Sequence, residues 1–199
     1  MKTGTDPYGP AYAELFSALG RLLPQGPLLL AIDGGSASGK STLGAYLSER
    51  YDGTLFHMDD FFLRTEQRTP ARYAEPGGNV DRERFLAEVL EPVSRREPVS
   101  LRKLDHTGGV FRLMEPVTVV PKAFVIVEGA YSLHPDLEAY YDYSVFLRIS
   151  PELQAERVLA RNGPEGAKMF RERWIPLEQT YFEALHPVER CDLVIDVTE

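Results

Sequence analysis

The sequence predicts an α/β fold in which one parallel sheet is covered on both faces by helices, in a single domain over residues 1–199. Uninterrupted apolar runs at 28–32 and 123–127, and a largely apolar run at 143–149, are typical of strands buried on both faces. Segments with apolar residues at helical spacing alternate with these runs, as expected where helices connect parallel strands. A chain of 199 residues suits one domain with a sizeable core.

The N-terminal part leads up to a glycine-rich turn. Residues 1–9 contain Gly, Thr, Asp and Pro and are expected to form a flexible tail. Apolar residues recur at helical spacing over 10–23, and the Pro-Gln-Gly-Pro stretch that follows ends this predicted helix. The strand at 28–32 comes next, and after the turn a second helix is predicted over 40–50. The turn therefore joins a strand to a helix.

The middle of the chain is predicted to hold a second strand at 54–58 and then a long loop. Residues 63–79 are rich in Arg, Pro and Gly. Long loops in compact domains are often functional, so we expect this one to face the substrate. A helix is predicted over 80–90, and loose alternation over 99–119 predicts a small antiparallel excursion with its turn at 105–109.

The C-terminal part continues the alternation of strands and helices after the strand at 143–149. Pro151 opens a helix that the Asn-Gly-Pro stretch at 162–164 is expected to break. A further helix is predicted over 165–185 with a kink at Pro176, and the last strand over 193–197.

The turn after the first strand carries the pattern Gly34-x-x-x-x-Gly39-Lys40-Ser41, which is that of a phosphate-binding P-loop. Glycines let the backbone approach phosphate oxygens, and the loop N–H groups form an anion site with the following helix N-terminus. Lys40 can reach the β and γ phosphates, and the Ser41 hydroxyl suits Mg²⁺. The residues expected to bind nucleotide are Gly34, Gly35, Ser36, Ala37, Ser38, Gly39, Lys40, Ser41 and Thr42.

Three carboxylates stand at the predicted carboxyl ends of strands, where ligands gather in open α/β sheets. Asp59 and Asp60 follow the second strand, and one of them is expected to accept the proton of an alcohol during phosphoryl transfer. The alternative is a pair of solvated turn residues. Glu128 follows the strand at 123–127 and is expected to hold Mg²⁺, directly or through water, or to orient Asp59. A cap or a salt bridge is the alternative for Glu128.

A cluster of cations is expected to form a lid over residues 161–175. Arg157 and Arg161 lie four residues apart and share one helix face. Cations that close over the phosphates would stabilise the charge that moves in transfer, and Arg161 is the expected catalytic residue among them. Three more cations lie just beyond the helix break: Lys168, Arg171 and Arg173. The alternative is a solvated basic helix.

The expected acceptor-binding residues are Asp59 and Asp60 with three others: Tyr73, Asp81 and His106. Asp81 opens the helix after the long loop. Its carboxylate could cap that helix or accept hydrogen bonds from two hydroxyls of a sugar, and the sequence does not decide between them. A lone histidine such as His106 is more often structural than catalytic.

Composition excludes several classes of partner. The formal net charge of −8 does not favour nucleic acid, and no apolar segment is long enough to cross a bilayer. The single cysteine, Cys191, cannot form an internal disulfide, which is typical of a reducing compartment. We expect a cytoplasmic protein that acts on a small molecule, with neither nucleic acid nor membrane as partner. Whether it forms a homo-oligomer is left open.

Together these motifs resemble the uridine kinase and phosphoribulokinase family of P-loop kinases, and most of all small bacterial uridine kinase-like proteins. The resemblance spans most of residues 27–197 in the family's order. The stretches that match are Gly34–Thr42, Phe56–Phe62, Asn79–Asp81, Val125–Gly129, Arg157–Arg161 and Asp192–Asp196.

The resemblance implies a three-layer P-loop NTPase fold with five parallel strands in the order 2-3-1-4-5 and a short lid. It also implies that Asp59 is the general base and that Asp81 binds the ribose hydroxyls of a nucleoside. Asp60 replaces a family Ser, and related nicotinamide riboside kinases also carry Asp-Asp-Phe-Phe there. The family residues that hold the pyrimidine are replaced by Leu104-Asp105-His106, so uridine itself is not implied as acceptor.

The sequence therefore predicts an ATP- and Mg²⁺-dependent phosphotransferase of uridine kinase-like type. It would transfer the γ-phosphate to a hydroxyl of a small molecule, first of all the 5′-hydroxyl of a nucleoside. Lys40, Asp59 and Arg161 are its expected catalytic residues, and Ser41 and Glu128 its metal ligands. The alternatives are a kinase of another small alcohol, of pantothenate, nicotinamide riboside or sugar type, and a regulatory protein that hydrolyses or binds nucleotide.

Overall fold

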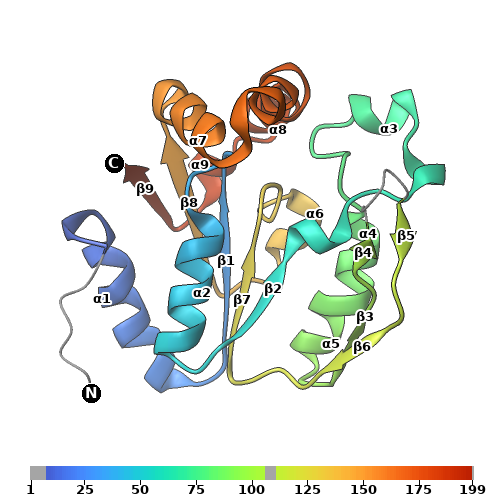
Figure 1. Ribbon diagram of the computed structural model, residues 1–199. Coiled ribbons are helices and arrows are strands. Elements are labelled where there is room, and N and C mark those ends of the chain that lie inside the picture. The colour runs from blue at the N-terminus through green and yellow to red at the C-terminus, as the bar shows by residue number, and fades with distance from the viewer. Residues whose placement is uncertain (1–7, 106–110, 199) are drawn as a thin grey trace.

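A five-stranded parallel sheet forms the centre of the molecule (Figure 1). The computed structural model describes residues 8–105 and 111–198. With all strands labelled along the chain, the order in the sheet is β2-β7-β1-β8-β9 rather than 2-3-1-4-5. The labels differ because β3 to β6 lie outside this sheet; its five strands counted alone run 2-3-1-4-5. The five strands are β1 (Leu28–Gly34), β2 (Thr54–His57), β7 (Phe124–Glu128), β8 (Tyr143–Ile149) and β9 (Leu193–Val197).

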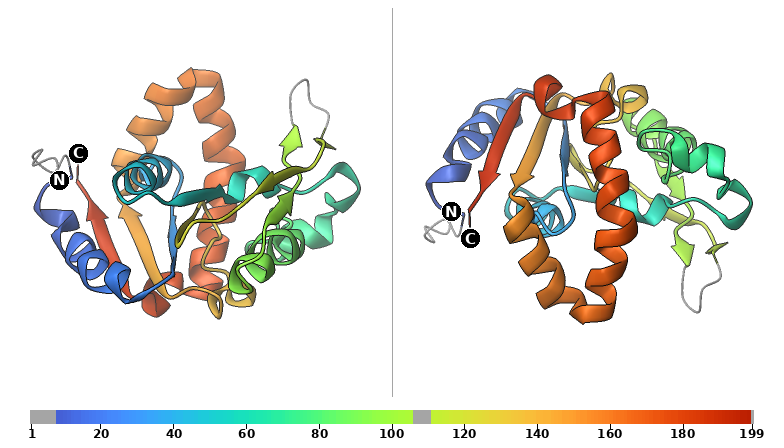
Figure 2. Two further views of the ribbon diagram at one scale, coloured as in Figure 1. Left: turned by 90° about the horizontal axis from the view of Figure 1, so that it is seen from below. Right: turned by 90° about the horizontal axis from the view of Figure 1, so that it is seen from above.

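Helices cover both faces of this sheet, as Figure 2 shows from above and below. The α-helices are α1 (Ala13–Leu22), α2 (Lys40–Arg50), α3 (Pro70–Ala74), α4 (Arg82–Phe85), α5 (Glu91–Ser94), α6 (Pro135–Glu138), α7 (Pro151–Met169), α8 (Ile175–Leu185) and α9 (Pro187–Arg190). Short 3₁₀ turns are η1 (Pro10–Tyr12), η2 (Leu23–Gln25), η3 (Met58–Phe61) and η4 (Thr65–Gln67), and π-helical turns are η5 (Leu86–Leu90) and η7 (Phe170–Trp174). The three-layer α/β architecture expected from the sequence is confirmed.

Alternate residues of β1 face two separate apolar cores, because successive side chains of a strand point to opposite faces. Leu30 and Ile32 pack with Leu43 of α2 and Leu19 of α1 on one face. Leu29 packs on the other face within the core formed by α4, η5 and α8. Every residue of β1 is buried, as predicted for the middle strand of a covered parallel sheet.

The register of the sheet brings the carboxyl ends of three strands together. Glu128 at the end of β7 pairs with Ile32 of β1 and with His57 of β2. The loop after β1, the segment after β2 and Glu128 therefore meet at one edge, which is where an open α/β sheet binds ligands.

Two helical segments form an arch that rises from this edge. In α7 the residue Gly163 has non-helical backbone angles (φ 67°, ψ 179°), so the helix breaks where the Asn-Gly-Pro stretch predicts it. The chain then passes through η7 and returns as α8 (Figure 2). Pro176 lies at the start of α8, directly after the π-helical turn η7.

The segment 63–79, predicted as a long loop, contains two short helical elements, η4 and α3. The Thr69 side chain accepts from the backbone N–H of Arg72 and caps α3, and Pro70 opens that helix. Gln67 accepts from the backbone N–H of Arg64 and closes η4. Local capping thus orders a stretch whose composition is typical of a loop.

The excursion predicted over 99–119 is present as two short antiparallel pairs. β3 (Val99–Leu101) pairs with β6 (Val117–Val119), and β4 (Leu104–Asp105) pairs with β5 (Arg112–Leu113). This ribbon lies beside the 63–79 segment in Figure 1.

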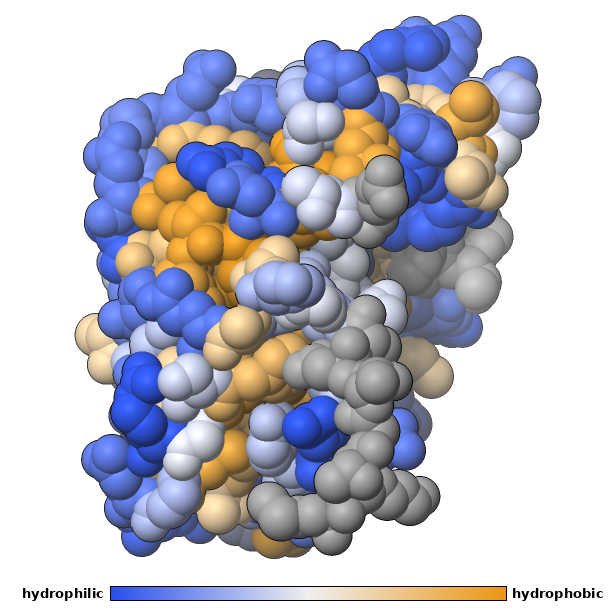
Figure 3. All heavy atoms as spheres, turned by 90° about the vertical axis from the view of Figure 1, so that its left-hand side faces the viewer, coloured by the Kyte–Doolittle hydropathy of each residue, from blue (hydrophilic) through white to orange (hydrophobic). Residues whose placement is uncertain are grey.

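The N-terminal region packs against the outside of α2. The ring of Tyr8, which the sequence assigned to a flexible tail, lies 4.8 Å from the Tyr12 ring and 4.9 Å from the Tyr46 ring. On the face that carries α1 and β9, apolar surface is visible between charged side chains (Figure 3). No helix in the described part of the chain is long and apolar enough to cross a membrane.

Candidate active site

A cavity of about 740 Å³ opens at the edge where the strands end. Six residues of the P-loop form one wall, and the segment after β2 and the arch of α7 and η7 form the others. Several of the expected site residues line it together: Ser36, Ala37, Gly39, Lys40, Ser41, Thr42, Asp59, Glu128 and Arg161. The structure therefore brings the predicted P-loop, carboxylates and lid cation to one place.

The P-loop adopts the wrapped backbone that an anion site needs. Gly34 has φ 144°, and a Cβ there would lie 2.4 Å from the backbone oxygen of Leu147, so only glycine fits. Gly39 has φ 99° and precedes the first residue of α2. The buried Lys40 ammonium donates to the carbonyl oxygens of Gly34 and Gly35, each at 2.9 Å. These bonds hold the ammonium within the loop, at the wall of the cavity.

Glu128 links the P-loop to the second strand. It is 3% exposed, accepts a hydrogen bond from the Ser41 hydroxyl at 3.1 Å and lies 2.5 Å from Nδ1 of His57. The bond to Glu128 raises the pKa of His57, which sequence reasoning did not single out. Gly129 has φ 145°, and a Cβ there would lie 2.6 Å from the Cβ of Met58, so the chain turns sharply after Glu128.

Ser41 and Glu128 present oxygen atoms to the same wall of the cavity. A hydroxyl and a carboxylate in contact are the ligand types that Mg²⁺ prefers, and this ion is commonly held by one or two protein oxygens together with phosphates. Among the described residues no group of three or more His, Cys, Asp or Glu side chains could hold a metal. The residues present therefore fit a magnesium ion that is shared with a nucleotide, and not one held by protein alone.

Asp59 lies at the carboxyl end of β2, in η3, and its side chain is exposed to the cavity. In the described part of the chain its carboxylate accepts no hydrogen bond. Desolvation by the surrounding protein raises the pKa of Asp59, and the nearby Lys40 ammonium acts in the opposite direction. A carboxylate without a fixed partner at the end of a strand is placed to accept a proton from a ligand.

Two arginines of α7 face the P-loop side of the cavity. Arg157 donates from Nη1 to the carbonyl oxygen of Ala37 at 3.3 Å. Arg161 donates from Nε to Asn162 and lies over the ring of Phe170, 5.3 Å from its centroid. Both guanidinium groups line the cavity and neither pairs with a carboxylate in the described part of the chain.

Sequence reasoning missed the carboxylate of Asp33, which lies beneath the P-loop and is fully buried. It accepts from the backbone N–H groups of Gly34 at 2.6 Å, Tyr131 at 3.1 Å and Leu133 at 2.9 Å, and from the Tyr181 hydroxyl at 2.7 Å. Burial raises the pKa of Asp33. This carboxylate joins the start of the P-loop to the turn after β7 and to α8.

Sequence reasoning also missed Glu178 of α8, which is 3% exposed. Its carboxylate accepts from the backbone N–H of Ser36 at 3.0 and 3.1 Å, from the Ser36 hydroxyl, and from Gln154 at 3.3 Å. Burial raises the pKa of Glu178. No pattern around residue 178 indicates this contact, since its partner lies 142 residues away.

Two more of the predicted acceptor residues, Asp60 and Tyr73, do not line the cavity. Asp60 pairs with Lys103 at 2.8 Å, and Tyr73 lies beneath the guanidinium of Arg173. His106 lies outside the described residues. Gly34, Gly35 and Ser38 belong to the loop but do not line the cavity.

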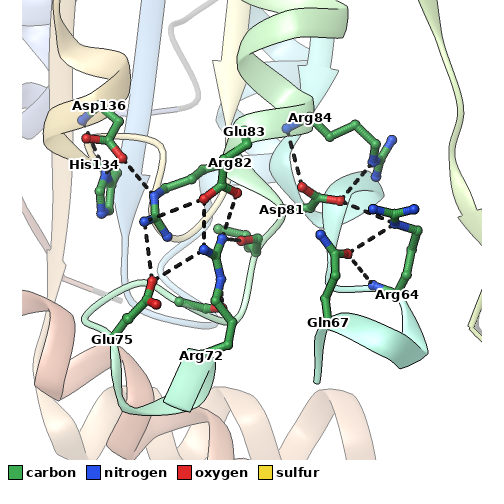
Figure 4. Close-up of polar contacts among 12 residues, drawn as sticks. Arg64, Gln67, Arg72, Glu75, Asp81, Arg82, Glu83, Arg84, His134 and Asp136 are labelled. Carbon is green, nitrogen blue, oxygen red and sulfur yellow. Dashed lines mark hydrogen bonds and ion pairs between the residues drawn. The ribbon is translucent and has the colours of Figure 1, made fainter. Parts of the chain in front are cut away.

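Asp81 lines a second, shallower cavity. Figure 4 shows the contacts of its carboxylate. It caps α4 by accepting from the backbone N–H of Arg84, and it also accepts from Arg84 Nε at 3.3 Å and lies 3.6 Å from Arg64 Nε. The carboxylate is 2% exposed. Of the two roles that the sequence left open for Asp81, the structure shows the helix cap.

Comparison with known proteins agrees with this geometry. No protein-family model matches the chain. The uridine kinase of Oceanobacillus iheyensis is 28% identical over 147 residues, which cover 69% of this chain and 69% of that protein.

Two solved structures share the fold. A Silicibacter protein described as a fructose transport system kinase superposes with a TM-score of 0.70 at 24% identity, over 93% of this chain and 98% of that one. A Bacillus stearothermophilus protein described as a possible uridine kinase gives a TM-score of 0.64 at 22% identity, over 92% of this chain and all of that one.

Proposed function

This chain resembles the uridine kinases in sequence and has the fold of the P-loop kinases, and on that premise we propose that it transfers the γ-phosphoryl group of ATP to a hydroxyl of a small molecule. One observation carries the proposal: Asp59 reaches the cavity that the P-loop opens into, with no hydrogen-bond partner among the described residues. A proton acceptor beside a phosphate site is what transfer to an alcohol requires.

Some residues of the cavity would bind the phosphate donor, ATP, and others would act on the acceptor alcohol. Lys40 and the N–H groups of the P-loop would bind the ATP phosphates, and Arg157 and Arg161 would close over them from α7. Asp59 would accept the proton of the acceptor hydroxyl as that oxygen attacks the γ-phosphorus. ADP leaves with the electron pair of the broken bond.

Ser41 and Glu128 would hold Mg²⁺. When bound, this ion neutralises part of the charge on the phosphates. His57 supports the arrangement by its bond to Glu128, which holds the carboxylate in contact with Ser41. ATP and Mg²⁺ are thus the expected donor and cofactor.

Two acceptor classes are candidates. The 5′-hydroxyl of a nucleoside such as uridine or cytidine is supported by several curated relatives that are uridine kinases. Another small alcohol, of pantothenate, nicotinamide riboside or sugar type, is favoured by a specific observation. The carboxylate that would bind ribose, Asp81, is buried and bonded to Arg84, and it does not line the cavity.

A matched pair of variants tests the proposal. In Asp59→Asn the ATP affinity is expected to stay within about threefold of wild type while acceptor-dependent ADP release falls by about 100-fold or more, the usual scale for a lost general base. In Asp60→Asn, whose carboxylate bonds to Lys103 outside the cavity, ADP release should change little. Equal activity of Asp59→Asn and wild type would show that Asp59 is not the base.

A further inference from the structure

The cavity contains a third unpaired arginine that the donor phosphates do not explain. Arg68, Arg157 and Arg161 all line it, and none of the three has a carboxylate within 4.0 Å in the described part of the chain. The second cavity differs, because three of its arginines, Arg64, Arg72 and Arg84, each pair with acidic side chains. In a chain with 30 acidic and 22 basic residues, unpaired arginines that converge on one cavity indicate anionic ligands.

Arg68 lines the cavity, and only one of its guanidinium nitrogens has a hydrogen-bond partner among the described residues. Its Nε donates to the carbonyl oxygen of Leu63 at 2.9 Å, and its guanidinium lies over the Phe111 ring, 3.3 Å from the centroid. Its two Nη groups donate to none of the described residues, and the unplaced stretch 106–110 contains no Asp or Glu. Burial lowers the pKa of Arg68, and the nearby Tyr73 acts in the opposite direction.

Neighbouring contacts hold the segment that carries Arg68 in place (Figure 4). Before it, Gln67 accepts from both the backbone N–H and Nε of Arg64. After it, Arg72 donates to the carbonyl oxygens of Gly78 and Val80, each at 2.9 Å, and pairs with Glu83 at 2.7 Å. Because the chain is anchored on both sides, the guanidinium is pre-organised, which lowers the entropy cost of binding.

The position of Arg68 is on the acceptor side of the cavity. Its partner Leu63 lies four residues after Asp59 on the same segment, whereas Arg157 bonds the P-loop itself. Part of the cavity lining is aromatic, because Phe62 and Trp174 stack there with ring centroids 6.2 Å apart at 28°. An acceptor lying against these rings would have its hydroxyl toward Asp59 and its other end toward Arg68.

We propose that the acceptor is a small alcohol that carries an anionic group, a carboxylate or a phosphate, and that the Arg68 guanidinium binds this group. The planar fork of an arginine suits both anions, which can accept two parallel hydrogen bonds. This inference rests on the proposed kinase function and selects one class among its acceptors.

The reaction balances with groups already named. The acceptor hydroxyl oxygen forms a bond to the γ-phosphorus of ATP, and the bond from that phosphorus to the β–γ bridging oxygen breaks. ADP departs with the electron pair, and the hydroxyl proton passes to Asp59. The anionic group on the acceptor is unchanged and serves only for recognition.

The test compares acceptors in charged and neutral pairs. ADP release from ATP and Mg²⁺ is measured with D-glycerate against glycerol, pantothenate against pantothenyl alcohol, and a pentose 5-phosphate against the free pentose, with uridine as the neutral nucleoside. The charged member of at least one pair is expected to exceed its neutral partner by tenfold or more in kcat/KM. A carboxylate acceptor and a phosphate acceptor are thereby distinguished.

Arg68→Gln then identifies the residue. It is expected to lower kcat/KM for the charged acceptor by about 10- to 100-fold, the range for a lost charge-assisted hydrogen bond, and to leave the KM for ATP within about threefold. Arg21→Gln, an exposed arginine of α1 that does not line the cavity, is the matched control and should behave as wild type.

A binding readout separates recognition from turnover. Trp174 is the only tryptophan of the chain and lines the cavity, so its fluorescence reports a ligand there. With a non-hydrolysable ATP analogue and Mg²⁺ present, the charged acceptor should give a saturable change that weakens in Arg68→Gln. Circular dichroism confirms that the variant is folded.

The outcomes distinguish the inference from the function on which it rests. If only neutral acceptors such as uridine are phosphorylated, or if Arg68→Gln leaves charged acceptors unaffected, the kinase function stands and this inference is wrong. If Arg68→Gln raises the KM for ATP instead, the residue belongs to the donor site and the inference is also wrong. If no alcohol in either series raises ADP release above background, the kinase function fails and the inference fails with it.

Discussion

Replacing the buried Asp33 carboxylate by an amide should destabilise the protein and loosen the P-loop. Oδ1 accepts from the N–H groups of Gly34 and Tyr131, and Oδ2 accepts from the N–H of Leu133 and the Tyr181 hydroxyl. In Asp33→Asn one of these oxygens becomes an NH₂ group, which cannot accept. The Tyr181 hydroxyl can rotate and accept from the new amide, but the N–H of Leu133 cannot.

The expected loss follows from this count. One buried N–H left without an acceptor costs about 1–3 kcal/mol, and relief of a desolvated charge offsets part of it. We therefore expect Asp33→Asn to lower the free energy of unfolding by about 2 kcal/mol. For a chain of this size that corresponds to a fall in Tm of roughly 4–8 °C.

Two further variants test the reasoning. Tyr181→Phe removes one donor and leaves the carboxylate with three, so it should cost only about 1 kcal/mol. Asp192→Asn is the matched control, because Asp192 also accepts from a backbone N–H and a hydroxyl, both of Ser144, but it is exposed to solvent. Urea unfolding measures all three. If Asp33→Asn and Asp192→Asn lose the same stability, burial is not the source of the cost and the reasoning is wrong.

The other predictions concern the chemistry. Lys40→Met should leave circular dichroism unchanged and reduce ADP release by about 100-fold or more, since the ammonium that faces the phosphates is lost; activity within tenfold of wild type would contradict this. A general base works only when deprotonated, and burial raises the pKa of Asp59, so kcat/KM should fall as the pH drops through a value above the ordinary aspartate pKa of about 4. An acid limb at or below 4 in the pH–rate profile would exclude this assignment. Glu128→Gln should raise the Mg²⁺ concentration for half-maximal rate by about tenfold or more, and an unchanged Mg²⁺ titration would remove Glu128 from the metal site.

The elements that the sequence predicted well are those specified by local patterns. The apolar runs became buried strands, and Gly34 to Ser41 formed the turn between a strand and a helix because glycine spacing dictates that backbone. The break near Gly163 followed from the Asn-Gly-Pro stretch in the same way. In each case the physical cause lies within a few residues of the effect.

The residues that sequence reasoning missed depend on long-range contacts. Asp33 bonds partners 98 to 148 residues away, and Glu178 bonds Ser36 across 142 residues. Neither carboxylate stands in a motif, so only the folded chain reveals its donors. The prediction of a long loop over 63–79 missed two helical elements for a different reason. Arginine hydrogen bonds and a threonine cap order this segment, although its composition is typical of a loop. The sequence also left the role of Asp81 open, because its contacts with Arg84 and Arg64 are seen only in the folded chain.

The measurement that tests the central claim most directly is the detection of phosphorylated product. ATP, Mg²⁺ and the panel of neutral and charged alcohols are incubated with wild type and with Asp59→Asn, and the new phosphate ester is followed by ³¹P NMR alongside ADP. The account predicts one ester formed for each ADP with wild type and almost none with Asp59→Asn. ADP released together with inorganic phosphate, at a rate that no alcohol changes, would contradict it and identify a nucleotide hydrolase.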